Sequence, residues 1–284
     1  MHSRGSYIFL QLWALGRTAD LKTIQADGFD LTSSSAVPMD ADAPTPRELS
    51  IVEIKAFIAD YAQAARNAIE AGFDGVEIHG ANYYLIDQFV QDNSNRRTDD
   101  YGGSIENRSR FAVEVATAVV DAVGADRVGI RLSPFSDFQG MKMQDPIPQS
   151  THLLKELKLL KLAFIHVVQS VPEGDEDPDP NEKVDFAVDV WDDTSPVIIT
   201  GNFNVISAFE AADKEFRDKD VIIAFGRRFL STPDLVFRLR HGIELNSYDR
   251  STFCVPKAEP GYIDQPFSKE FERVNKASKL AYMQ

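Results

Sequence analysis

Short apolar segments separated by longer amphipathic ones recur along the chain. Six apolar runs, each ended by turn residues, are the candidates for strands: residues 7–12, 75–78, 128–132, 162–168, 196–200 and 221–224. Each run is almost continuously apolar, which is typical of a strand buried on both faces of a parallel sheet. Between the runs, apolar residues return at helical spacing. Strands that alternate with helices predict crossover units and a parallel α/β sheet.

The clearest helix is predicted over residues 51–71, where Ser50 and Glu53 form a capping box at its start. A second helix is predicted over residues 105–123, with Ser104 as its N-cap. Weaker periodic patterns predict three more helices, over residues 151–160, 205–216 and 233–240.

This order of elements indicates an α/β barrel of the TIM (β/α)8 type. Such barrels reach about 250 residues as one unit, and we find neither an internal repeat nor a linker, so we interpret residues 1–284 as one domain. A closed barrel has eight strands, whereas the chain supplies six candidates. Because the first apolar run begins already at Tyr7, with no preceding helix, we expect that something upstream of it is missing.

Composition and charge narrow the function classes. Hydrophobic residues make up 43% of the chain, which is enough for a real core. The formal net charge of −14 and the lack of a basic stripe argue against nucleic acid and anionic membranes as partners. No apolar run reaches the roughly 18 to 20 residues of a membrane span. Cys254 is the single cysteine, so no internal disulfide can form and a reducing, cytoplasmic location fits best.

Polar side chains cluster where the second predicted strand ends, at His79, Asn82 and Tyr84. In parallel α/β proteins the reactive groups lie at the carboxyl ends of strands. An imidazole and a carboxamide could polarise a carbonyl oxygen, and a phenol could supply a proton. Each residue also has an ordinary structural interpretation when it is taken singly: His79 as a satisfied core histidine, Asn82 as a helix N-cap and Tyr84 as a packing residue.

Further polar groups follow the later strands. Arg131 ends an apolar run, where a guanidinium needs an anion, an electron-rich ligand or a local carboxylate. Gly201-Asn202 and Gly226-Arg227 precede helical segments, as expected for a phosphate site after the last two barrel strands. A nucleotide-type cofactor is therefore predicted. No cluster of histidine, cysteine and carboxylate has the spacing of metal ligands.

The sequence resembles the old yellow enzyme family, which consists of flavin-dependent ene-reductases. The segment HGANYY at residues 79–84 is similar to the substrate-binding signature of that family, and NRRTDDYGGSIENR at residues 95–108 to its long loop and following helix. Similar agreement continues through residues 131–134, 201–203, 225–227, 233–235 and 246–253. The resemblance therefore covers nearly the whole chain.

The resemblance implies FMN as the cofactor and NADPH as its reductant. The cofactor-binding residues that it implies are Gln11, Arg131, Gly201, Asn202, Gly226, Arg227 and Phe253. Of these, Gln11 and Arg131 would contact the pyrimidine end of the flavin, and Phe253 would pack against it. The glycines, Asn202 and Arg227 would hold the phosphate.

The implied reaction is the reduction of the C=C bond of an α,β-unsaturated carbonyl compound, an enone or enal. His79 and Asn82 would bind the carbonyl oxygen of this substrate. Hydride would pass from flavin N5 to the β-carbon, and Tyr84 would protonate the α-carbon. An isomerase acting on a related enal would need this proton donor removed, so Tyr84 argues against it.

Three departures from the family pattern bear on this expectation. By the resemblance, the first two β/α units of the family's barrel are missing, which would leave two open sheet edges, makes an isolated monomer doubtful and leaves a homodimer open. Cys254 stands where relatives often carry a tyrosine that lines the substrate pocket, and Tyr83 replaces a commonly small residue. The alternative to an active enzyme is a catalytically silent truncated barrel, which would be a binding or regulatory protein or an incomplete gene product.

Overall fold

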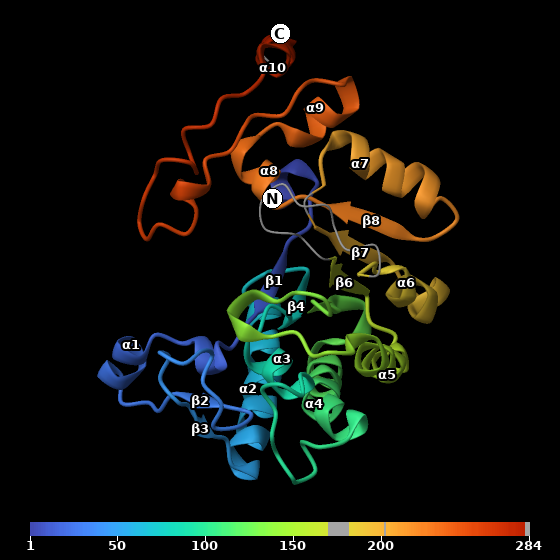
Figure 1. Ribbon diagram of the computed structural model, residues 1–284. Coiled ribbons are helices and arrows are strands. Elements are labelled where there is room, and N and C mark those ends of the chain that lie inside the picture. Colours follow the sequence, from blue (N-terminus) through green and yellow to red (C-terminus); the bar gives the residue numbers. More distant parts are fainter. Residues whose placement is uncertain (170–181, 202, 282–284) are drawn as a thin grey trace.

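The computed structural model describes residues 1–169, 182–201 and 203–281. Its main sheet has six parallel strands in the order β1-β4-β5-β6-β7-β8 (Figure 1). These are β1 (Phe9–Leu12), β4 (Gly75–Gly80), β5 (Val128–Leu132), β6 (Phe164–Val168), β7 (Val197–Thr200) and β8 (Val221–Ala224). All six predicted strands are confirmed, because none of their ends differs by more than two residues from the prediction.

Helices connect these strands and cover one face of the sheet, where α2, α4 and α5 lie side by side (Figure 1). The helices are α1 (Leu21–Ala26), α2 (Ile51–Glu70), α3 (Leu85–Val90), α4 (Ile105–Val123), α5 (Pro146–Lys158), α6 (Asp185–Trp191), α7 (Val205–Glu210), α8 (Arg227–Ser231), α9 (Leu235–His241) and α10 (Lys269–Ala281). Short 3-10 turns occur at His2–Arg4, Gly16–Thr18, Ala125–Arg127, Phe138–Gly140, Asp192–Thr194 and Arg250–Thr252, and a π turn at Ala211–Glu215.

The two strongest helix predictions are confirmed together with their caps. The Ser50 side chain accepts a hydrogen bond from the Glu53 backbone N–H at the start of α2, and the Glu53 side chain accepts one from Ser50. At the start of α4, the Ser104 side chain accepts a hydrogen bond from the Asn107 backbone N–H. The weaker predictions differ at their ends: α5 begins five residues early, at Pro146, because proline at the first helical position already has a helical φ.

The two faces of the sheet are covered unequally. On the helix side, Val76 and Ile78 of β4 are 0% exposed and belong to the main hydrophobic core. On the other face, Glu77, His166 and Ile198 are only partly buried. The prediction that the strands are buried on both faces is therefore wrong for this face. The six strands do not close around it, so solvent reaches the side that a complete barrel would enclose.

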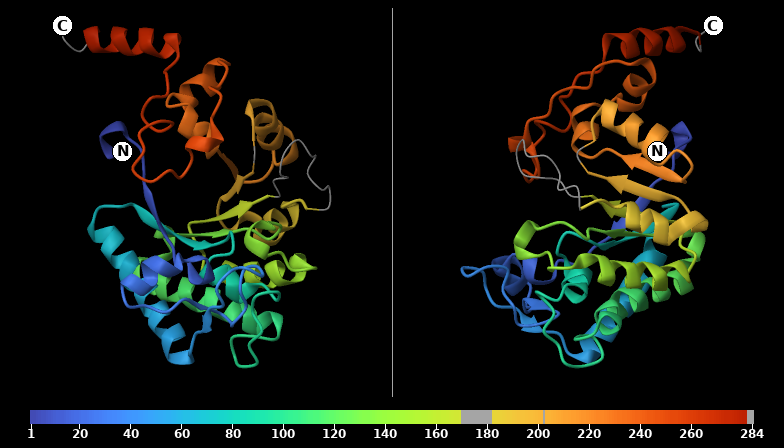
Figure 2. Two further views of the ribbon diagram at one scale, coloured as in Figure 1. Left: turned by 60° about the vertical axis from the view of Figure 1, so that its left-hand side comes forward. Right: turned by 45° about the vertical axis from the view of Figure 1, so that its right-hand side comes forward.

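The outermost strands are open. Along the described chain β1 pairs only with β4 and β8 only with β7, so the sheet does not close on itself. Phe9 on β1 is 37% exposed and Ile222 on β8 is 49% exposed. This geometry agrees with a partial barrel that has six of the eight strands of the TIM type. Figure 2 shows α10 (red) at the end of the molecule opposite to α2 (blue).

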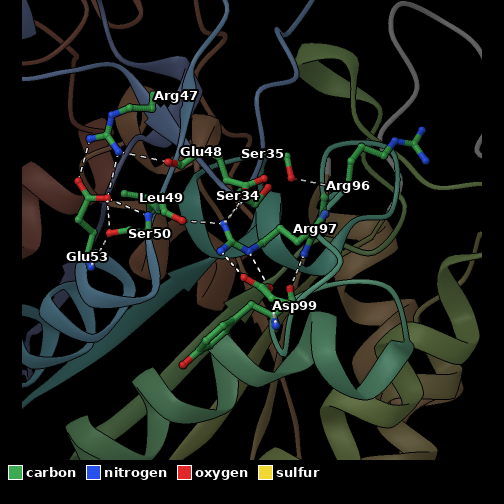
Figure 3. A network of polar contacts seen from close by, with 12 residues as sticks. Ser34, Ser35, Arg47, Glu48, Leu49, Ser50, Glu53, Arg96, Arg97 and Asp99 are labelled. Atoms are coloured by element: carbon green, nitrogen blue, oxygen red, sulfur yellow. Dashed lines mark hydrogen bonds and ion pairs between the residues drawn. The ribbon is translucent and has the colours of Figure 1, made fainter.

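A buried arginine anchors the loop that joins α3 to α4. The Arg97 side chain is 2% exposed, and it donates hydrogen bonds to the backbone carbonyls of Ser34, at 2.9 Å, and Leu49, at 2.7 Å (Figure 3). Its second branch pairs with Asp99 at 2.6 Å. The carbonyls lie beside the unpredicted two-stranded sheet of β2 (Thr32–Ser33) and β3 (Arg47–Glu48). The conspicuous motif at residues 95–108 thus holds this subdomain against α3 and α4.

Candidate functional site

The turn after β4 carries Asn82 and Tyr84 in a strained backbone. Asn82 and Tyr83 both have positive φ, 51° and 73°, which side chains other than glycine rarely adopt. Neighbouring side chains hold the turn. The Ser133 hydroxyl accepts a hydrogen bond from the Asn82 backbone N–H at 2.7 Å, and Asp87 accepts one from the Tyr83 N–H at 2.9 Å. These bonds fix the direction in which the turn presents its two polar side chains.

Gln88 of α3 completes this support. Its amide nitrogen donates to the Tyr83 carbonyl at 2.5 Å and to the Leu15 carbonyl at 3.1 Å. Its carbonyl oxygen accepts from the Ser33 hydroxyl and from the Arg17 backbone N–H. The side chain is 0% exposed, and all four bonding positions of its carboxamide are used. Gln88 and Asp87 were not singled out in the sequence, because their roles depend on contacts distant along the chain.

His79, Tyr84 and Trp13 form one aromatic group at the carboxyl ends of β4 and β1. The ring of Tyr84 lies 4.8 Å from that of Trp13 and 5.1 Å from that of His79, measured between centroids. His79 and Tyr84 were expected to act together, and the fold brings them side by side. Trp13 packs edge-on against the phenol.

The imidazole of His79 is neutral at ordinary pH. Its residue is 4% exposed, and burial, reinforced by the charge of Arg131, lowers the pKa of His79 to about 4. Its Nδ1 is buried and has no hydrogen-bond partner among the residues that the structure describes. A buried, unpaired ring nitrogen is costly unless a ligand meets it. Among the described residues, no side chain or backbone group satisfies this nitrogen in the way expected of an ordinary core histidine.

The phenol of Tyr84 stays protonated. Burial raises the pKa of Tyr84 above its ordinary value, the negative charge that Cys254 can carry raises it further, and the positive charge of Arg131 opposes both. A phenol in this state can give a proton to a basic carbon. Cys254 itself is exposed, and it lies within electrostatic range of the phenol. The other reading of Asn82, as a helix N-cap, is wrong, because Tyr84 precedes the first residue of α3.

Arg131 lies near the end of β5, on the inner face of the sheet, which is the face that the helices do not cover. Its partners in the strand register are His79 on β4 and His166 on β6. Burial lowers the pKa of Arg131, which the negative charge of Glu77 opposes. No hydrogen bond engages its guanidinium among residues 1–169, 182–201 and 203–281. Its donors thus remain available to an electron-rich ligand at the sheet surface.

A cavity of about 220 Å³ opens beside Arg131 at the carboxyl ends of β5 to β8. Its lining includes Arg131, Thr200, Gly201, Gly226, Arg227 and Arg228. Three arginines around one hollow, in a chain of net charge −14, favour an anion such as a phosphate. The predicted Gly201, Gly226 and Arg227 are thus brought together, whereas Asn202 lies outside the described residues.

Two glycines, Gly201 and Gly226, line this cavity. A Cβ at Gly201, where φ is +155°, would lie 2.3 Å from Cγ of Gln169, so a larger residue would displace that side chain. A Cβ at Gly226 would meet no atom within 4 Å, so the backbone there borders open space. Together with the arginines, this lining fits the phosphate end of FMN.

Tyr248 and one unpredicted cation, Arg228, line the same cavity. The Arg228 guanidinium lies 5.2 Å from the ring centroid of Tyr248. The predicted flavin contact Phe253 does not line the cavity, but its ring lies 5.5 Å from that of Tyr248 between centroids. Arg228 could have been noticed in the sequence as the second cation of the Gly226-Arg227-Arg228 run.

The predicted Gln11 belongs to a polar group that sequence reasoning missed. Its amide nitrogen donates to Glu77 Oε2 at 2.6 Å, and Nδ1 of His166 lies 2.8 Å from Glu77 Oε1. Buried Nε2 of His166 has no partner among the described residues. The sequence did contain a signal for this group. Polar residues 77 and 79 alternate with apolar ones in the same strand, so both point to the same face of the sheet. The described chain holds no group of three or more potential metal ligands, and none of its helices is both long and apolar enough to cross a membrane.

Comparison with known proteins agrees with this site. Residues 1–246 match the family described as NADH:flavin oxidoreductase / NADH oxidase. Chanoclavine-I aldehyde reductase fgaOx3 of Penicillium roqueforti (strain FM164) is 54% identical over 279 residues, which cover 98% of this chain and 76% of that protein. A protein of Claviceps purpurea (strain 20.1) named probable inactive dehydrogenase easA is 49% identical, over 95% of this chain and 73% of its own.

A solved structure, that of morphinone reductase, superposes with a TM-score of 0.84 at 37% identity and covers 94% of this chain and 74% of that chain. The predicted barrel class is confirmed by this match and by the parallel six-stranded sheet.

Proposed function

Since the chain belongs to the NADH:flavin oxidoreductase / NADH oxidase family, the family of the old yellow enzymes, we propose that it reduces the C=C bond of α,β-unsaturated carbonyl compounds with FMN and NADPH. The strongest support is the pair formed by His79 and Tyr84, whose ring centroids lie 5.1 Å apart. The imidazole of His79 is neutral and buried and has a nitrogen without a partner among the described residues, while the phenol of Tyr84 is protonated. One group can bind an oxygen while the other delivers a proton.

The residues of the turn after β4 divide the work on the substrate. His79 and Asn82 donate hydrogen bonds to the substrate carbonyl oxygen, so they stabilise the negative charge that develops there. Because His79 is neutral, it donates without competing for the proton. Tyr84 then transfers its phenolic proton to the α-carbon and is reprotonated from solvent. Cys254, near this phenol, borders the carbon skeleton and influences substrate preference.

The inner face of the sheet and the cavity hold the cofactor. Gln11 and Arg131 bind the pyrimidine end of the ring, and Phe253 packs beside it. Gly201, Asn202, Gly226 and Arg227 bind the phosphate. When bound, FMN supplies the hydride that the β-carbon receives, after reduction by the nicotinamide. Arg131 contributes a fixed positive charge to the region where the reduced ring is negative.

A catalytically silent flavin-site protein is the second candidate. Two observations favour it: the sheet edges at β1 and β8 are open, and a relative at 49% identity is named probable inactive. Against it stands the complete set of His79, Asn82 and Tyr84.

The visible absorption spectrum of bound flavin distinguishes the two candidate functions. The purified chain is mixed with FMN, separated from free flavin and examined in the visible range, then titrated anaerobically with NADPH and, in parallel, with NADH. An active enzyme retains a flavin band that bleaches with the nicotinamide and returns when a simple enone such as cyclohexenone is added. A chain that retains no flavin, or whose flavin never reoxidises with any enone or enal, contradicts the proposal.

The role of Tyr84 is tested by Tyr84→Phe. This change removes the proton but keeps the ring that packs on Trp13 and His79. We expect reoxidation by the enone to slow by about 10²-fold or more, the usual contribution of a positioned acid, while reduction by NADPH stays within twofold. Tyr7→Phe, at a tyrosine that is 78% exposed, is the control and leaves both half-reactions unchanged.

A further inference from the structure

Three polar side chains from three strands form a chain of contacts on the open inner face of the sheet. Gln11 of β1 donates to Glu77 of β4 at 2.6 Å, and Glu77 in turn contacts Nδ1 of His166 on β6 at 2.8 Å. Gln11 and Glu77 are direct partners in the strand register. The side chains of Glu77 and His166 are 13% and 15% exposed, so the pair is largely shielded from water although the sheet is open.

The chemistry of Glu77 dictates how Gln11 is turned. An ionised carboxylate only accepts hydrogen bonds, so the carboxamide of Gln11 must direct its nitrogen toward Glu77. Its carbonyl oxygen is then directed away, and no described residue donates to that oxygen. Gln11 itself is exposed on the inner face, so this oxygen is available to a ligand.

Glu77 keeps its charge through its surroundings. Burial opposes ionisation, but the hydrogen bonds from His166 and Gln11 and the charge of Arg131 hold the pKa of Glu77 below its ordinary value. His166 also occupies one carboxylate oxygen, so that the other remains directed at Gln11. Since the group stays an obligate acceptor, the orientation of Gln11 is fixed before any ligand arrives.

We propose that Glu77, held by His166, is a positioning residue that makes Gln11 present a hydrogen-bond acceptor, and so selects ring systems that carry an N–H at this edge. This inference rests on the proposed function, because the ring in question is that of FMN. The isoalloxazine ring has one such group, N3–H, on its pyrimidine end. A glutamine whose amide could rotate freely would accept or donate with equal ease and would not discriminate.

The test compares FMN with N3-methyl-FMN, in which the N–H is replaced. Dissociation constants of both are measured by flavin fluorescence for the unaltered chain and for Glu77→Gln, which keeps the shape but can donate as well as accept. The added methyl group also needs space, and this cost is the same in both proteins. The informative quantity is therefore the dissociation constant of N3-methyl-FMN divided by that of FMN. One neutral hydrogen bond predicts that this ratio falls by about fivefold in Glu77→Gln.

Two further proteins separate positioning from general damage. In a Gln11→Leu background no amide remains to be turned, so Glu77→Gln should leave the ratio unchanged. Glu70→Gln, at an exposed glutamate at the end of α2, should behave as the unaltered chain. Circular dichroism checks that each variant is folded.

The outcomes distinguish the proposals. If the unaltered chain does not bind FMN, the proposed function fails and this inference with it. If FMN binds and the ratio falls in Glu77→Gln but not in the Gln11→Leu background, the inference is supported. If FMN binds and the ratio stays the same, or falls equally without Gln11, Glu77 does not orient Gln11 and only the inference is overturned.

Discussion

Gln88 offers the sharpest test of how the site is supported, because its side chain is fully buried and its carboxamide makes four hydrogen bonds. These reach the Tyr83 and Leu15 carbonyls, the Ser33 hydroxyl and the Arg17 backbone N–H. Gln88→Met keeps nearly the same length and removes every one of these bonds. The partners are themselves buried or nearly so, and water cannot replace the lost bonds without opening the turn.

The expected loss follows from these contacts. Four hydrogen bonds at about 1 kcal/mol each, less about 1 kcal/mol gained by burying the apolar side chain, lower the free energy of unfolding by about 3 kcal/mol. That is a large part of the 5 to 15 kcal/mol typical of a domain. Urea unfolding followed by circular dichroism measures it. Since the Tyr83 carbonyl is released, enone reduction should also fall more than FMN affinity does.

Gln63→Met is the matched control. Gln63 is exposed on α2 and bonds only two side chains of its own helix, Asn67 at 2.8 Å and Arg66 at 3.2 Å, so its replacement should change the free energy of unfolding by less than about 0.5 kcal/mol. If Gln88→Met loses less than about 1 kcal/mol, or no more than Gln63→Met, the turn does not depend on this carboxamide and the reasoning is refuted.

Two further predictions concern buried charges. A lysine at position 97 cannot reach the Ser34 and Leu49 carbonyls and Asp99 together. We therefore expect Arg97→Lys to lower the free energy of unfolding, measured in urea, by about 2 to 3 kcal/mol. The control Arg96→Lys, at an exposed side chain, should change it by less than about 0.5 kcal/mol, and equal losses in the two variants would contradict the role of Arg97. Burial raises the pKa of Asp87 to about 7, above its unfolded value of about 3.9, so the folded chain binds the extra proton and stability falls as pH rises from 4 to 7. Asp87→Asn should remove this slope between pH 4 and pH 7, and parallel pH profiles of the two proteins would disprove it.

The sequence by itself determined the class of fold and most of the candidate site. Apolar runs and capping residues are local signals, so the six strands and the starts of α2 and α4 could be read from them. His79, Asn82 and Tyr84 were found because the carboxyl ends of parallel strands meet at one edge, which makes polar residues there informative without coordinates.

Only the tertiary structure decided which groups support that site and how far the sheet is covered. Glu77 and His166 are 89 residues apart, and Ser33 and Gln88 are 55 apart, so no local pattern joins them. The exposure of the inner face likewise depends on whether the first and last strands meet, which is a property of the whole sheet. Side-chain type and spacing are local, whereas burial and hydrogen-bond partners arise only when distant segments pack together.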